Sequence, residues 1–122
     1  MKIQANPIDN FDTRKYPVGC VTQYFGENPQ LYKFTKAHSG WDIVSNKVDS
    51  YGLPIYSMYD CEVFLIDDDK TNSTGLSVTT INKQGILCIY GHLSEILVKE
   101  GDLVNAARPI VTGKPHNHTL NI

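Results

Sequence analysis

Short runs of β-branched and aromatic residues, interrupted by Gly, Pro, Asn and Asp, make up most of the chain from Val18 onward. Such runs are typical of β-strands joined by turns. No window of about 11 residues or more carries apolar positions at the 3.6-residue spacing of an amphipathic helix. The pattern therefore predicts an all-β fold with little helix.

The runs predict strands at residues 18–25, 54–59, 62–66, 76–81 and 86–90. The last two segments flank N-K-Q-G and predict a hairpin, because Gly85 readily adopts the backbone conformation of a tight turn. Residues 93–98 are expected to contain one helical or irregular turn, followed by a tight turn at K-E-G-D-L-V.

Three consecutive aspartates, Asp67 to Asp69, precede T-N-S-T-G. They lack the alternating ligand spacing and the glycine position of a calcium-binding loop. The segment therefore predicts a solvated hairpin tip between two strands.

The first 17 residues are polar, are broken by Pro7 and Pro17, and show no clear period. They predict an N-terminal arm, residues 1–17, that lies over the surface of one domain formed by residues 18–122. A chain of 122 residues suits one domain, and a domain of this size buries roughly two thirds of the surface of its unfolded chain. No apolar segment is long enough to cross a bilayer, and the N-terminus does not resemble a signal peptide.

Charge and cysteine content exclude some classes of partner and of fold. With 11 Lys and Arg against 13 Asp and Glu, the net charge is −2, so we expect no binding to nucleic acid and no insertion into a membrane. Cys20, Cys61 and Cys88 are odd in number and lack C-x-x-C spacing. They predict buried small hydrophobic residues, not a disulfide framework.

The four histidines all lie in short motifs that carry possible metal ligands. His38 begins H-S-G-W-D, and an extended strand would separate His38 from Asp42 by about 13 Å. The two side chains can share a metal only if the chain bends between them, and Gly40 permits that bend.

His116 and His118, in P-H-N-H, would point to the same face of a strand, with Cα atoms about 6.5–7 Å apart. That spacing favours one metal ligand and one neighbouring proton carrier. His92, in Y-G-H-L, is placed to be a second polar group at such a site. Two imidazoles, one carboxylate and an open fourth position are typical of a catalytic zinc site.

Each motif alone also has an ordinary structural interpretation. A single histidine is more often structural than catalytic, and H-x-x-x-D by itself is a weak signal. When the motifs occur together in one small β domain, a metal site and ordinary structural roles become equally good interpretations.

The chain resembles peptidase family M23, the lysostaphin-like zinc endopeptidases that cut peptide bonds in bacterial peptidoglycan. The likeness covers residues 18–118. It rests on V-T-Q-Y-F-G, H-S-G-W-D, Y-G-L-P-I-Y-S-M-Y-D-C-E-V, Y-G-H-L-S, V-K-E-G-D-L-V and P-H-N-H, which follow in the family's order.

The resemblance implies an antiparallel β domain with one Zn²⁺ in an open groove. It implies that His38, Asp42 and His118 are the zinc ligands, and that His92 and His116 are the catalytic pair. The partner would be a peptide of bacterial peptidoglycan. The setting would be a phage particle, or a phage lysin released from the host cytoplasm to the cell wall. For Tyr24, Tyr32 and Trp41, contact with substrate and simple packing both remain open.

The sequence departs from the family in two places. The segment A-A-R-P-I-V-T-G-K is shorter than the usual glycine-rich connection, so one wall of the groove is expected to be reduced. The family's H-L-H-F-E reads H-N-H-T-L here, and the chain stops at Ile122. The last strand would then be frayed, loosely paired or completed by association with a partner. A catalytically weak or inactive module that binds cell wall, or that regulates another hydrolase, is the alternative function.

Overall fold

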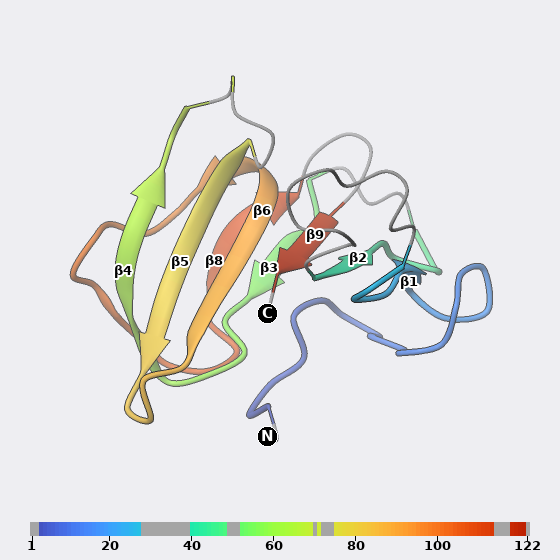
Figure 1. Ribbon diagram of the computed structural model, residues 1–122, viewed down its shortest axis with the longest axis horizontal. Coiled ribbons are helices and arrows are strands. Elements are labelled where there is room, and N and C mark those ends of the chain that lie inside the picture. The colour runs from blue at the N-terminus through green and yellow to red at the C-terminus, as the bar shows by residue number, and fades with distance from the viewer. Residues whose placement is uncertain are drawn as a thin grey trace.

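The computed structural model describes residues 3–27, 40–48, 52–69, 71, 75–113 and 118–121, with only the backbone described for 111–113 and 118–121. This part of the chain forms a nine-stranded sheet (Figure 1) and contains no helix that would be long and apolar enough to cross a membrane. The strands are β1 (Val21–Gln23), β2 (Trp41–Ile43), β3 (Pro54–Tyr56), β4 (Cys61–Asp67), β5 (Leu76–Asn82), β6 (Leu87–Ile96), β7 (Leu103–Val104), β8 (Pro109–Gly113) and β9 (His118–Asn121). All of their pairings are antiparallel, so the prediction of an all-β fold is confirmed.

β6 is the strand that joins the two halves of the sheet. The strand order is β1-β2-β9-β6-β5-β4-β7, and β8 pairs with both β6 and β3. One edge of β6 lies along β5, as Figure 1 shows. On the other edge, residues 89–91 pair with β9 and residues 93–96 pair with β8. Along this edge, β6 therefore changes its partner strand from β9 to β8.

A β-bulge lies where β6 changes partner. The pairings with β5 on either side differ by one residue in register, so that Gly91 and His92 together face Ser77. His92 has a φ of 55°, in the left-handed region that few residues other than glycine adopt. Bulges bend a strand and redirect a side chain. The direction of the His92 side chain is therefore set by the bulge.

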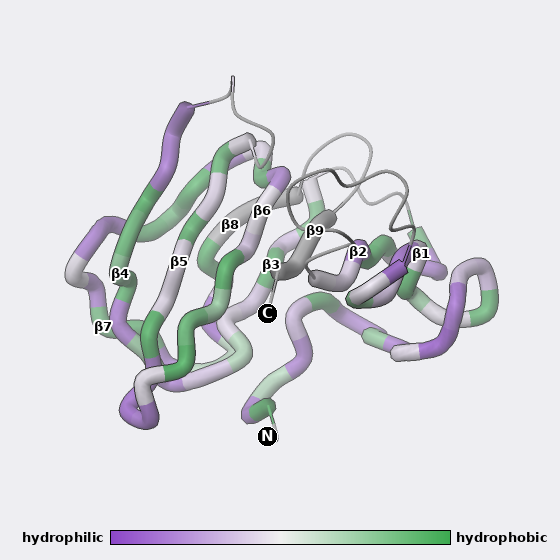
Figure 2. The backbone as a smooth tube through the Cα atoms, in the orientation of Figure 1, coloured by the Kyte–Doolittle hydropathy of each residue, from purple (hydrophilic) through white to green (hydrophobic). Residues whose placement is uncertain are grey.

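Both predicted hairpins are confirmed. Between β5 and β6, the Asn82 Oδ1 accepts the N–H groups of Gln84 at 3.0 Å and Ile86 at 2.9 Å, and Gly85 has a φ of 81°. Figure 2 shows that this hairpin tip is hydrophilic. Between β4 and β5, the pairing of Asp67 with Ser77 makes the acidic segment a hairpin connection, of which 70 and 72–74 lie outside the described residues.

The turn predicted at 93–98 is wrong for its first part. Residues 93–96 continue β6 and pair with β8. Leu93 is buried, whereas residues 94–96 are half-buried or exposed without regular alternation, and the register with β8 shifts between Leu93 and Glu95. The pairing with β8, not the burial pattern, therefore identifies this segment as a strand. The predicted strands at 18–25 and 54–59 are shorter than expected, namely β1 and β3.

The core contains side chains from both ends of the described chain. Ile8 is 1% exposed and belongs to the main hydrophobic cluster, so the N-terminal segment also packs into the core. The proposed boundary between an arm at 1–17 and a domain at 18–122 stays a prediction. Cys20, Cys61 and Cys88 are all free thiols, as predicted, and the predicted burial is confirmed for Cys20 and Cys88, whereas Cys61 is half-buried.

Tyr90 holds β6 against the segment that follows β3. Its ring is 0% exposed, and its hydroxyl oxygen accepts the Met58 N–H at 3.1 Å. Burial raises the pKa of the Tyr90 hydroxyl, so it stays protonated in the physiological range. The hydroxyl thereby satisfies a backbone donor that water cannot reach.

We expect Tyr90→Phe to lower the free energy of unfolding by about 1–3 kcal/mol, because the Met58 N–H would lose its acceptor in the core. Tyr16→Phe is the matched control, since the Tyr16 side chain is 52% exposed. Urea unfolding measures both. Equal effects of the two substitutions would contradict this role of the Tyr90 hydroxyl.

We also expect His92→Val to be about 1–2 kcal/mol less stable than His92→Asn, because a β-branched residue is strained at a left-handed φ that Asn tolerates. Both variants lose the imidazole, so their difference isolates the backbone. Glu95→Val, on the same strand, controls for β-branching alone. Urea unfolding that gives the two His92 variants the same stability would show that the bulge is not as described.

Candidate functional site

Asp42 lies in the middle of β2, between two strands. Gly40, immediately before β2, is buried and sits at a bend, as the sequence predicts for this position. Ile43 is 0% exposed and anchors one face of β2 in the core. Because neighbouring residues of a strand alternate in direction, the half-buried Asp42 lies on the opposite face. Thr22 Oγ1 donates to the Asp42 carbonyl at 3.2 Å and fixes the strand on its other side.

β9, the strand that carries the predicted ligand His118, lies next to Asp42. The Cα partner of Asp42 is Thr119, and the Cα partner of Ile43 is His118. Thr119 is also the partner of Gly91 on β6. The described backbone of β9 therefore has β2 on one edge and β6 on the other.

His92 follows Gly91 and lies within β6, not after it as the sequence suggested. Its side chain is half-buried. Gly91 is linked through Thr119 to Asp42 by cross-strand pairing. Three strands that are far apart in sequence thus place Asp42, the His118 backbone and His92 in one region of the sheet.

The other predicted site residues are not all described. His38, His116 and Tyr32 lie outside the described residues, as does the side chain of His118. Among the side chains that the structure does describe, no three His, Cys, Asp or Glu residues form a metal-binding group. The ligand set and the catalytic pair therefore stay predictions. Their donor types, two imidazoles and a carboxylate, fit zinc chemically.

Tyr24 and Trp41 pack together beside Asp42. Their ring centroids are 5.2 Å apart with an interplanar angle of 86°, an edge-to-face arrangement worth about 0.5–1.5 kcal/mol. Both side chains also pack against the core cluster. Both side chains therefore have a packing role, whereas their contact with substrate stays a prediction.

The N-terminal segment supports this aromatic pair through contacts that no pattern in the sequence predicts. The Tyr24 hydroxyl donates to the Thr13 carbonyl, and the Lys15 Nζ lies 5.0 Å from the centre of the Tyr24 ring. Next to them, the hydrogen bond from the Arg14 side chain lowers the pKa of Asp12 to about 2. The segment is therefore fixed on the side of β1 that faces away from β9.

Comparisons with known proteins identify the family. The sequence profile described as "Peptidase family M23" matches residues 36–119. A comparison with curated protein sequences gives no match.

Solved structures with the same fold include three peptidases. The catalytic domain of a mutant of the prophage-encoded M23 protein EnpA from Enterococcus faecalis is 25% identical, with a TM-score of 0.64, over 83% of this chain and 75% of that one. The catalytic domain of lysostaphin from Staphylococcus simulans is 24% identical, with a TM-score of 0.63, over 82% and 74%. A zinc-containing peptidase from Vibrio cholerae is 24% identical, with a TM-score of 0.68, over 98% of this chain but only 35% of that one.

The profile covers most of the chain, including every histidine and aspartate that the sequence analysis assigned to the site. The antiparallel sheet matches that of the lysostaphin catalytic domain. The chain therefore belongs to peptidase family M23, a family of metallopeptidases, and has the lysostaphin-like fold.

Proposed function

We propose that this domain is a zinc-dependent endopeptidase that hydrolyses peptide bonds in the cross-links of bacterial peptidoglycan. The observation that carries the proposal is the match to family M23, because its span of 36–119 includes His38, Asp42, His92, His116 and His118. A chain that had lost the activity would be expected to have lost some of these polar side chains.

The described part of the structure supports the proposal through the position of Asp42. A carboxylate held on a strand with a buried neighbour is a rigid ligand, which a metal site requires. Its strand lies beside β9, in which the residue paired with Asp42 is Thr119, the neighbour of His118. Because cross-strand partners share a face, binding of one metal by Asp42 and His118 requires β9 to shift by one residue relative to β2. His38, four residues before Asp42 and separated from it by the bend at Gly40, would complete the set of ligands.

In this proposal the residues have distinct chemical roles. His38, Asp42 and His118 would hold the zinc, which when bound would lower the pKa of water toward about 7 and polarise a carbonyl group. His116 would accept a proton from the attacking water, and His92 would donate a hydrogen bond to the developing oxyanion. The left-handed backbone at His92 is consistent with such a role, because strained conformations gather at active sites.

Two relatives suggest the setting. EnpA is prophage-encoded, and lysostaphin is an antimicrobial peptidase. By analogy, we propose a phage lysin or a wall hydrolase of the phage particle, acting on peptidoglycan peptides. Tyr24, Tyr32 and Trp41 are the aromatic residues proposed to line the groove.

Metal content and activity together test the assignment of roles. His118→Ala should lose bound zinc, because a ligand is removed. His116→Ala should keep zinc and lose about 10²–10⁴-fold in turnover, the usual contribution of an acid–base group. Zinc would be measured by mass spectrometry of the purified protein, and cleavage by the release of new amino groups from purified cell walls. Asn117→Ala is the control, since it changes the residue between the two histidines.

Retention of equal amounts of zinc by both histidine variants would show that the ligand assignment is wrong. A wild-type protein without stoichiometric zinc, or with zinc but no chelator-sensitive cleavage, would favour the alternative of a module that only binds cell wall.

A further inference from the structure

A second β-bulge lies in β1, opposite Asp42. Val21 is the Cα partner of Ile43, and the next pair joins Gln23 to Asp42. Between these two pairs β1 has one residue more than β2, and that extra residue is Thr22. Bulges are frequent beside active sites, where they redirect side chains. This bulge adjoins the carboxylate that is proposed as a zinc ligand, on the edge of β2 that faces away from β9.

The Thr22 hydroxyl bonds the backbone of Asp42 directly. Its Oγ1 donates to the Asp42 carbonyl oxygen at 3.2 Å. This hydrogen bond restrains the peptide plane that follows Asp42, and therefore the direction in which the Asp42 side chain leaves the strand. Ile43, the next residue, is 0% exposed and is held by the core. The backbone at Asp42 is thus fixed by packing on one face and by Thr22 at the strand edge.

The bulge also sets the residue that lies opposite Trp41. Tyr24 and Trp41 lie one residue beyond the pair formed by Gln23 and Asp42, and their rings are in edge-to-face contact. Without the extra residue in β1, Gln23 would face Trp41 instead. The single insertion at Thr22 therefore accounts for two contacts, one with Asp42 and one with the residue before it.

The N-terminal segment holds the bulge from the other edge of β1. Lys15 Nζ donates to the Thr22 carbonyl oxygen at 3.2 Å and to the Glu27 carboxylate at 2.8 Å. Next to it, the Tyr16 N–H donates to the Val21 carbonyl oxygen at 3.0 Å. The Thr22 side chain is exposed. Hydrogen bonds on both edges of β1, not burial, therefore keep Thr22 in position.

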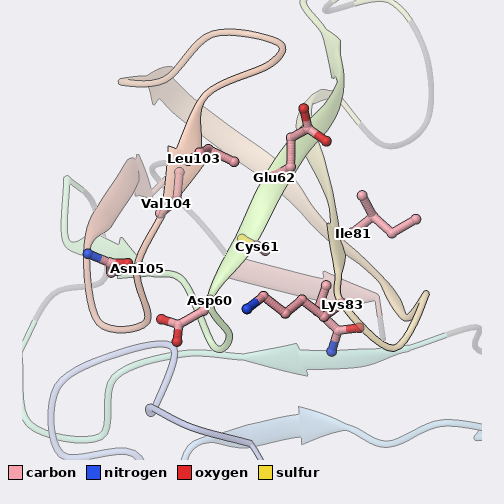
Figure 3. A pocket seen from close by; sticks show the side chains of 9 residues that line it. Asp60, Cys61, Glu62, Ile81, Lys83, Leu103, Val104 and Asn105 are labelled. Atoms are coloured by element: carbon pink, nitrogen blue, oxygen red, sulfur yellow. The ribbon is translucent and has the colours of Figure 1, made fainter.

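The same N-terminal segment has a second contact with the sheet that is not linked to Asp42. The Gln4 side chain accepts the Asp60 N–H at 2.7 Å. Figure 3 shows Asp60 at the edge of a hollow between β4, β5 and β7. In the strand order, three strands separate β4 from β2. The Gln4 contact therefore attaches the segment to the fold without touching the bulge.

We propose that Thr22 is a positioning residue of the metal site, which holds Asp42 in the orientation that binds zinc. The role of Thr22 rests on the proposed function, because it requires zinc to bind at Asp42. Hydrogen bonds that support a metal ligand raise the affinity for the metal, since the ligand is already in place when the metal arrives.

A purely structural role of the same hydrogen bond has different consequences. A bond that only stabilised the pairing of β1 with β2 would affect folding and leave the zinc affinity of the folded protein unchanged. The contribution of this bond to folding is small, because water can replace the exposed Thr22 hydroxyl. Zinc affinity and folding stability therefore separate the two roles.

The test compares Thr22→Val with Thr22→Ser. Valine keeps the branched shape of threonine and removes the hydroxyl, whereas serine keeps the hydroxyl. Competition with a chelator of known zinc affinity should show about three- to tenfold weaker binding by Thr22→Val, the equivalent of one hydrogen bond. Thr22→Ser should bind zinc like the wild-type protein. In the zinc-free protein, the NMR signal of the Asp42 carbonyl carbon should shift in Thr22→Val and not in Thr22→Ser.

Two variants are the matched controls. Thr71→Val removes another exposed threonine hydroxyl, which donates to the Asp69 carboxylate at 2.6 Å. Gln4→Met removes the N-terminal contact that is not linked to Asp42. Both controls should bind zinc like the wild-type protein and leave the Asp42 carbonyl signal unchanged.

Equal zinc affinities of Thr22→Val and the wild-type protein would overturn the positioning role. Weaker binding that is fully explained by partial unfolding of zinc-free Thr22→Val, measured by urea titration, would also overturn it. A wild-type protein that binds no zinc, although its Asp42 carbonyl signal responds to Thr22→Val, would contradict the proposed function and with it this role of Thr22. The first two results leave the proposed function intact, so the two failures are distinguishable.

Discussion

The structure depends on the pairing of β6. A strand of ten residues presents backbone donors and acceptors along two edges, and each must find a partner where water is excluded. β5 covers one edge, whereas the other edge is divided between β9 and β8. The change of partner coincides with the bulge at Gly91 and His92. The same pairing inserts β9 between β6 and β2, so that one backbone constraint positions His92, β9 and Asp42.

The local features of this fold could be predicted from the sequence. The β5–β6 hairpin follows from residues near each other in the chain, since Asn82 bonds the turn and Gly85 adopts a positive φ. The all-β class follows in the same way from short apolar runs without helical spacing. The strand at 93–96 was missed because its pattern is ambiguous until β8 is present to cover one edge.

The candidate site was predictable as a set of residue types, but not as an arrangement. The pairing of Asp42 with Thr119 joins residues that are distant in sequence, and no local pattern specifies it. The bulge at His92 likewise arises from register between strands. The roles of the histidines are predicted by the family resemblance, and the structure adds the bulge in β6 at Gly91 and His92. The support of Tyr24 by Thr13 and Lys15 had no signal in the sequence, because both are contacts made by an irregular segment.

The central claim is that β2 and β9 assemble a zinc site from His38, Asp42 and His118. A crystal structure of the zinc-loaded protein, with anomalous diffraction recorded at the zinc edge, tests it most directly. The account predicts one zinc peak about 2.0–2.2 Å from an Asp42 carboxylate oxygen and from one nitrogen of each of these two histidines. A zinc peak bound by other residues, or no peak near Asp42, would contradict it.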